Sequence, residues 1–115
     1  MIDDKHNINI LKITNAINNA EKLTSKLNEN ILKIDGMSSH RIRHFLNNLL
    51  SEFDNVNYLE IGCWKGSTLI SSCYNNNIKK CIAIDNWSQF GGPENEFKDN
   101  IKKKFNKQQY RILQY

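Results

Sequence analysis

The chain has 115 residues and a formal net charge of +4, with 39% hydrophobic and 24% charged residues. This length allows one domain at most, with a modest core. No apolar run approaches the roughly 20 residues that a membrane span needs. The first residues also lack the basic and apolar regions of a signal peptide. We therefore expect a cytoplasmic protein without a membrane partner.

The three cysteines, Cys63, Cys73 and Cys81, match no zinc-binding spacing, and their odd number argues against a disulfide framework. We expect reduced thiols and no metal site. The lysines gather at positions 79–80 and 102–104, without an arginine cluster or a pattern of aromatic residues for stacking bases. A nucleic-acid partner is therefore not expected either.

Apolar and small residues recur at three- and four-residue steps from about Ile8 to Ile34, which predicts one long helix. They are Ile10, Ile13, Ile17, Ala20, Thr24, Leu27, Ile31 and Ile34. The same spacing is heptad-like, so the helix either packs on its own domain or pairs with a second copy as a coiled coil. We assign residues 1–35 to an N-terminal helical extension.

A turn at Gly36 separates this helix from the next one. Ser38 or Ser39 can cap a second helix that runs from about His40 to Phe53. Its apolar residues have ideal helical spacing and predict the face that packs against the core. They are Ile42, Phe45, Leu46, Leu49, Leu50 and Phe53.

Strand and helix patterns then alternate to the end of the chain. The expected strands are Tyr58–Ile61, Cys81–Ile84 and one starting at Tyr110, with helices at about Ser67–Tyr74 and Pro93–Phe105 between them. Such alternation predicts an α/β fold with parallel strands and right-handed crossovers. We expect a three-stranded parallel Rossmann-like half sheet in the order 3-2-1, with helices on both faces and two helices before it.

Acidic residues stand at the ends of the first two expected strands, at the sheet edge where such folds bind ligands. Glu60 precedes a turn bounded by Gly62 and Gly66, and a helix start behind that turn offers unpaired N–H groups. Asp85 ends the second strand about twenty residues later, where an acid can accept ribose hydroxyls. The spacing therefore predicts a nucleoside site.

Three nucleoside ligands can be compared at this site. A phosphate-binding loop needs its lysine after the second glycine, whereas Lys65 precedes Gly66, so we reject it. A dinucleotide site of the NAD type has the pattern G-x-G-x-x-G, and Trp64 stands at the position of its middle glycine. This site remains a lesser alternative. S-adenosylmethionine has a ribose for Asp85, an ammonium group that suits Glu60, and no phosphate.

The run from Leu59 to Ser67, taken with Ala83-Ile84-Asp85, resembles the class I S-adenosylmethionine-dependent methyltransferases. The Glu-Ile-Gly-x-x-x-Gly turn is closest to small-molecule O-methyltransferases. The run from Gly36 through Asp85 to Pro93 is similar to a microbial and viral subgroup of these methyltransferases. The resemblance covers about residues 36–115, which we assign to an incomplete cofactor-binding portion.

This resemblance implies S-adenosylmethionine as the cofactor and a set of residues that hold it. The set is Glu60, Gly62, Cys63, Trp64, Gly66, Ser67, Asp85, Asn86 and Trp87. Glu60 would anchor the turn or contact the cofactor's amino group, and Asp85 would accept the ribose hydroxyls. Asn86 or Trp87 would flank the adenine. No catalytic residue is assigned; His40, His44 and Trp87 are candidates for the acceptor side.

The chain supplies fewer strands than a complete class I methyltransferase, so we expect a fragment or a truncated gene product. The leading function is the cofactor-binding half of an enzyme that methylates an unknown small molecule or sugar. The alternative is a catalytically inactive chain that binds a nucleoside or forms oligomers. A homo-oligomer could form through the N-terminal helix or through the open sheet edge at residues 58–61.

Overall fold

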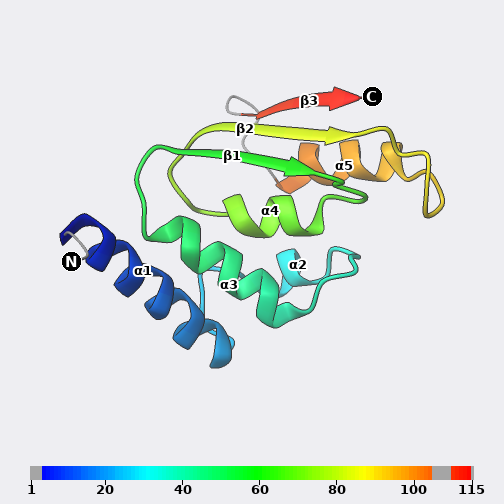
Figure 1. Cartoon of the computed structure of the whole chain (residues 1–115). Helices are drawn as coiled ribbons and strands as arrows, with labels where there is room; N and C mark the ends of the chain where they lie inside the picture. Colours follow the sequence, from blue (N-terminus) through cyan, green and yellow to red (C-terminus); the bar gives the residue numbers. More distant parts are fainter. Residues whose placement is uncertain (1–3, 105–109, 115) are drawn as a thin grey trace.

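The structure, a computed structural model, describes residues 4–104 and the backbone of residues 110–114. The elements in chain order are α1 (Asp4–Glu21), α2 (Glu29–Leu32), α3 (His40–Ser51), β1 (Val56–Ile61), α4 (Ser67–Cys73), β2 (Ile78–Asp85), α5 (Glu94–Lys104) and β3 (Tyr110–Gln114). The strands form an upper layer, and the helices are stacked below it, with α1 farthest from the strands (Figure 1). The predicted helix end at Phe105 and the turn at 106–109 lie outside the described residues.

The sheet differs from the expected one. β1 and β2 pair in parallel, with Tyr58 opposite Cys81 and Glu60 opposite Ala83. The backbone of β3 runs parallel to the other edge of β2, but its side chains lie outside the described residues. The expected three-stranded half sheet is thus corrected to a two-stranded parallel sheet, β1–β2, whose two faces the structure describes. In the described part of the chain five helices accompany it, and three of them precede β1 instead of two.

The prediction of helices on both faces of the sheet is also wrong. All five described helices lie on one side of the strands (Figure 1). The chain moves across the sheet in one direction, and right-handed crossovers then place α4 and α5 on the same face. The opposite face of β1 stays open, with Leu59 57% exposed and Ile61 74% exposed.

The core lies between the sheet and the helices below it. β2 contributes Cys81 and Ala83, which alternate with half-buried Ile82 and Ile84 on the open face. The helices contribute Leu69 and Ile70 of α4, Phe97 and Ile101 of α5, and Ile31 of α2, all nearly inaccessible to solvent. In residues 4–104, no helix has the length and apolar character needed to cross a membrane.

The single long helix expected from Ile8 to Ile34 is broken in two. α1 ends at Glu21, and Leu23 adopts a left-handed backbone with φ of 52°. The Asn28 side chain then accepts a hydrogen bond from the N–H of Ile31 and caps α2. The break turns Ile31 and Ile34 into the core and leaves the isoleucines of α1 exposed.

The second helix begins as predicted, with Ser39 as its N-cap, but its buried face is not the predicted one. Of the six expected core residues, Leu50 is buried, whereas Ile42 and Phe53 are exposed. The other side chains that α3 buries are polar: Arg43, His44 and Asn47. The apolar stripe therefore faces away from α4.

Arg43 explains this rotation of α3. Its guanidinium is 2% exposed and donates hydrogen bonds to the carbonyl oxygens of Ile31, Leu32 and Ile34 at 2.7–3.2 Å. Its Nε donates to Ser71 Oγ of α4 at 3.0 Å. Carbonyls at the end of a helix have no partner within it, and a fork of five N–H donors can satisfy several at once. Burial lowers the pKa of Arg43 from its ordinary value.

We predict that Arg43→Met lowers the free energy of unfolding by about 3 kcal/mol, because it removes the donors to the carbonyl oxygens of Leu32 and Ile34. Arg41→Met is the matched control two residues away. Arg41 is exposed and pairs with Glu21 at 3.6 Å, so its loss should cost under about 1 kcal/mol. Urea unfolding followed by circular dichroism measures both; equal effects would contradict a structural role for Arg43.

Candidate functional site

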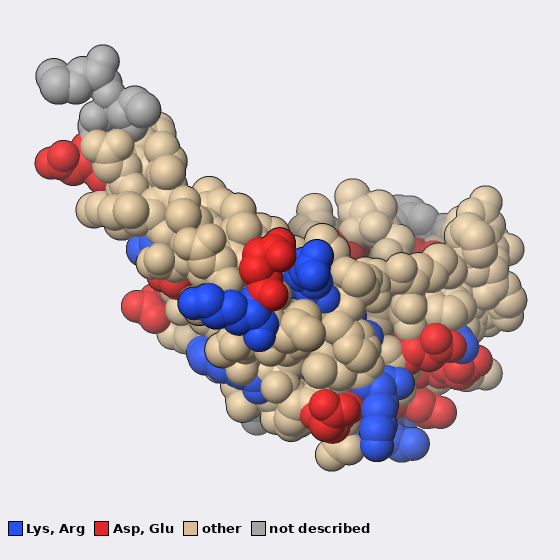
Figure 2. Space-filling view, turned by 90° about the horizontal axis from the view of Figure 1, so that it is seen from below, with Lys and Arg blue, Asp and Glu red and all other residues tan. Residues whose placement is uncertain are grey.

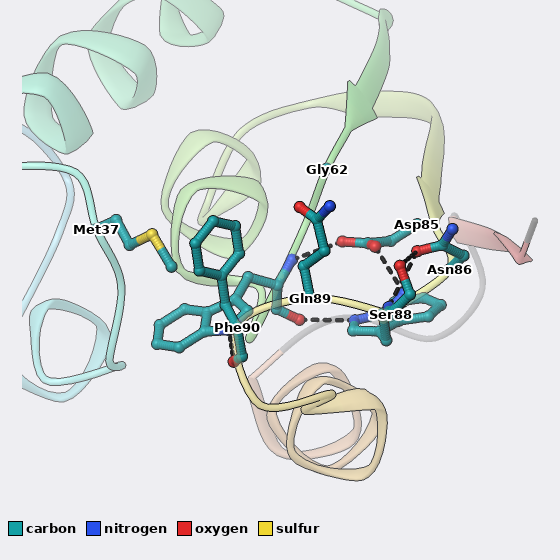
Figure 3. Close-up of a pocket in the computed structure, with 9 residues that line it drawn as sticks. Met37, Gly62, Asp85, Asn86, Ser88, Gln89 and Phe90 are labelled. Carbon is teal, nitrogen blue, oxygen red and sulfur yellow. Dashed lines mark hydrogen bonds between the residues drawn. The ribbon is translucent and has the colours of Figure 1, made fainter.

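A pocket of about 390 Å³ opens at the carboxyl ends of β1 and β2, between the turn after β1 and the loop after β2. It is lined by Met37, Gly62, Trp64, Asp85, Asn86, Trp87, Ser88, Gln89 and Phe90. Met37 and Phe90 lie at one end, while Asp85 and Asn86 lie at the other (Figure 3). The pocket therefore has an apolar end and a polar end.

The Asp85 carboxylate holds the two loops together. Its Oδ2 accepts hydrogen bonds from the backbone N–H groups of Cys63 at 2.7 Å and Trp64 at 3.0 Å. Its Oδ1 accepts from the N–H of Trp87 at 2.8 Å. Burial alone raises the pKa of Asp85, but the hydrogen bonds from these backbone groups outweigh it and lower that pKa. Asp85 is thus ionised at neutral pH and shapes both loops.

Two indole groups tie the loops together a second time. Trp87 Nε1 donates to the carbonyl oxygen of Trp64 at 2.8 Å, and Trp64 Nε1 donates to that of Phe90, also at 2.8 Å. The Trp87 ring is buried, with its centroid 5.0 Å from that of Phe97 on α5. Phe90 itself is 69% exposed above the pocket.

Three aromatic residues of the site have left-handed backbones: Trp64, Trp87 and Phe90, with φ of 47°, 51° and 53°. Trp64 occupies the position at which a dinucleotide-binding turn has its middle glycine. The structure shows that the tryptophan adopts the backbone that a glycine would supply, at a cost of about 1–2 kcal/mol. The hydrogen bonds to and from its backbone hold it there.

A second hollow of about 350 Å³ continues from the first, with Met37, Gly62 and Trp64 common to both. Its other lining residues are Ser38, Cys63, Ser67 and Thr68. Gly36 brings this segment close, because a Cβ at position 36 would lie 1.9 Å from Ser67 Oγ. Glycine is therefore required for residues 37 and 38 to reach the start of α4.

Glu60 and Gly66 line neither hollow. The Glu60 side chain lies beneath the turn, where its Oε1 accepts a hydrogen bond from the Tyr58 hydroxyl at 2.8 Å. Burial raises the pKa of Glu60, and the bond from Tyr58 opposes this in part. Gly66 is the N-cap of α4 and has Phe97 behind it. Both residues support the turn from behind.

The remaining candidates also have structural partners. Lys65 pairs with Asp35 at 3.0 Å and with Glu96 at 3.1 Å. His44 is buried, with its Nδ1 2.7 Å from Ser25 Oγ, and burial lowers its pKa. His40 is exposed at the start of α3 and lines neither hollow. Neither histidine therefore reaches the site from α3.

Seven of the nine predicted binding residues line one hollow or the other: Gly62, Cys63, Trp64, Ser67, Asp85, Asn86 and Trp87. Cys63 does so as a buried thiol, and burial raises its pKa to about 12. Sequence reasoning missed Met37, Ser38, Thr68, Ser88, Gln89 and Phe90 as lining residues. The sequence feature that could have identified them is their position, because each lies in or next to a predicted turn, loop or helix start.

Comparison with known proteins adds no further residue to the site. No protein-family model matches the sequence, and no curated protein matches it either. In the described part of the chain, no three His, Cys, Asp or Glu side chains gather as a metal ion would require. The geometry of the two hollows is therefore the basis for any functional argument.

We predict that Asp85→Asn destabilises the fold by about 1–3 kcal/mol, because the amide has one acceptor oxygen for three backbone donors and adds a donor beside them. Asp99→Asn on the exposed face of α5 is the control, with an expected change within about 0.5 kcal/mol. Urea unfolding followed by tryptophan fluorescence reports on both loops. An unchanged midpoint for Asp85→Asn would refute the role of the carboxylate as a tie.

We predict that Glu60 makes the stability of the fold depend on pH with a sign opposite to that of the usual carboxylate. Because burial raises its folded-state pKa above the ordinary value of 4.5, the folded chain holds this proton more tightly. The resulting stability is complete below that value and is lost as pH rises through the folded-state pKa. Glu60→Gln should therefore gain melting temperature relative to wild type between pH 4.5 and pH 7. Exposed Glu29→Gln should show no such gain.

Proposed function

We propose that the two hollows bind S-adenosylmethionine and that the chain is the cofactor-binding part of a methyltransferase. The acceptor would be a small molecule or a sugar. The observation that carries this proposal is the charge of the site. The described lining residues of both hollows include one carboxylate, Asp85, and no lysine or arginine.

This charge separates the candidate nucleosides. A dinucleotide or a nucleoside phosphate brings negative charge, which proteins usually meet with cations or with a row of free N–H groups. Here two N–H groups of the glycine turn are already bonded to Asp85. Lys65, whose Nζ lies 4.5 Å from the centre of the Trp64 ring, is held by Asp35 and Glu96. A ligand with a sulfonium and an ammonium group fits an acidic site with aromatic walls.

The fit can be described residue by residue. Each carboxylate oxygen has two lone pairs. Asp85 Oδ2 uses both on Cys63 and Trp64, whereas Oδ1 accepts one bond, from Trp87. The second lone pair of Oδ1 is the acceptor that this site offers to a ribose hydroxyl. Asn86, next to Asp85, or Trp87 would flank the adenine, and Phe90 provides an apolar wall toward the other end of the pocket (Figure 3).

The second hollow would take the amino-acid end of the same ligand. It borders the first at Gly62 and contains the hydroxyls of Ser38, Ser67 and Thr68. Ser38 Oγ is buried without a hydrogen-bond partner among the described residues, so it is a polar atom that a ligand could satisfy.

When bound, S-adenosylmethionine supplies an electrophilic methyl group for an acceptor oxygen or nitrogen. The role of this chain in such a transfer is positioning, since catalysis of this kind depends mainly on orientation. Asp85 orders both loops, and Trp64 and Trp87 fix their separation. The thiol of Cys63 keeps its proton at neutral pH because burial raises its pKa to about 12, so Asp85 is the one candidate proton acceptor among the described lining side chains. This observation favours the second candidate, a nucleoside-binding chain without activity.

The binding test is calorimetric titration of the wild type with S-adenosylmethionine, S-adenosylhomocysteine and NAD. We expect both adenosyl ligands to bind and NAD to bind at least about tenfold more weakly. Phe90→Ala removes an exposed ring without altering the core and should weaken both adenosyl ligands about tenfold, because an apolar wall of the pocket is lost. Leu11→Ala removes an equally exposed side chain of α1 and should leave affinity unchanged. No heat with either adenosyl ligand would refute the proposal.

A further inference from the structure

The most amphipathic helix of the chain turns its apolar stripe away from the domain. α3 buries Arg43 and Asn47 against α4, while Ile42 is 48% exposed and Phe53 is 36% exposed. α1 covers the stripe incompletely, because the residues that it buries are the small side chains Ala16 and Ala20. Large apolar surfaces on both helices are therefore left without a partner in the described part of the chain.

These surfaces form a valley between α1 and α3. The wider part, of about 590 Å³, is lined by Ile13 of α1, by Leu46, Leu49 and Leu50 of α3, by Phe53 just after α3, and by Val56 and Tyr58 at the start of β1. The narrower part, of about 270 Å³, lies between Ile17 and Ala20 on one side and Ile42 and Phe45 on the other. The two parts border the same apolar stripe of α3 in sequence, and together they are called the α1–α3 valley.

The α1 wall of this valley is an exposed apolar ridge. Ile10, Ile13 and Ile17 recur at three- and four-residue spacing along α1 and are 41–51% exposed. A ridge next to a valley is self-complementary: in a two-fold dimer the ridge of each copy enters the valley of the other. We propose that the α1–α3 face binds a second copy of this chain through this exchange.

The charges around the valley suit a second copy of the chain better than a partner whose surface carries charges of a single sign. Glu21, Arg41 and Asp54 line it, and Lys12 lies with its Nζ 4.5 Å from the centre of the Phe53 ring. The rim thus carries two charges of each sign and can meet its own image without net repulsion. Seen from below, the helical side of the molecule shows basic and acidic side chains intermixed (Figure 2).

The size of the face also fits a dimer. A standard interface takes about a tenth of the surface of a small protein, which for 7412 Å² is about 740 Å² per copy. α1 has 18 residues and is thus about 27 Å long, and two packed helices are about 20 Å wide, which gives about 500 Å² in projection. The walls of the valley add to that area.

The test is the mass of the full chain by sedimentation equilibrium from about 5 to about 500 µM, a range that brackets the affinity of a small interface. We expect the wild type to approach twice the monomer mass. The double variant Ile13→Glu with Ile17→Glu should weaken association about 100-fold, because both charges enter an apolar interface. Ile42→Glu, on the valley side, should do the same. Both sets of residues are exposed, and circular dichroism would confirm that each variant folds.

Two control variants make the result specific to this face. Leu11→Glu, on the other side of α1, is 62% exposed and should leave the dimer intact. Leu59→Glu, on the open face of the sheet, should also leave it intact. A monomeric wild type at the highest concentration would overturn the proposal. So would a dimer that Leu59→Glu disrupts and the α1 variants do not, because association would then occur through the sheet.

Discussion

The buried guanidinium of Arg43 is the interaction on which the helical layer depends. It has no carboxylate partner among the described residues, and it is satisfied by three carbonyls at and just beyond the end of α2 and by one hydroxyl of α4. A buried cation is costly unless its donors are all used. This requirement turns the polar side of α3 toward α4. The same rotation leaves the apolar stripe of α3 uncovered and so opens the α1–α3 valley.

The site is organised by the same principle with the opposite charge. Asp85 gathers three backbone N–H groups from two loops, as Arg43 gathers three carbonyls from the end of a short helix. In both places one ionised side chain replaces a stretch of regular secondary structure in satisfying the backbone. What remains for a ligand is small: one lone pair of Asp85 Oδ1, the hydroxyls at the start of α4, and the aromatic surface of Phe90.

Part of this structure could be predicted from the sequence. The strand before Glu60, the strand before Asp85 and the Ser39 cap each have a local cause, and the structure contains all three. Periodicity shows which face of a helix is apolar but does not show which face is buried, so the rotation of α3 was not predictable. The left-handed turn at Leu23 has no glycine to signal it.

The site follows the same division between local and tertiary causes. Asp85, Gly62 and Trp64 line the pocket because strand ends and turns position them. Phe90 depends on a hydrogen bond from the Trp64 indole to its carbonyl, which no spacing reveals. The face of the sheet that the helices cover follows from the handedness of the crossovers. Right-handed crossovers in one direction place both crossover helices on one side, and this outcome can be predicted from the sequence.

The left-handed aromatic residues of the loops have a kinetic consequence. Trp64, Trp87 and Phe90 hold conformations that an isolated loop would seldom adopt, and the folded chain stabilises them before any ligand arrives. A ligand that enters the pocket therefore meets walls already in place and need not order them. Association would proceed in a single step, without a slow phase of loop closure, and most differences in affinity between related ligands would appear in their rates of departure.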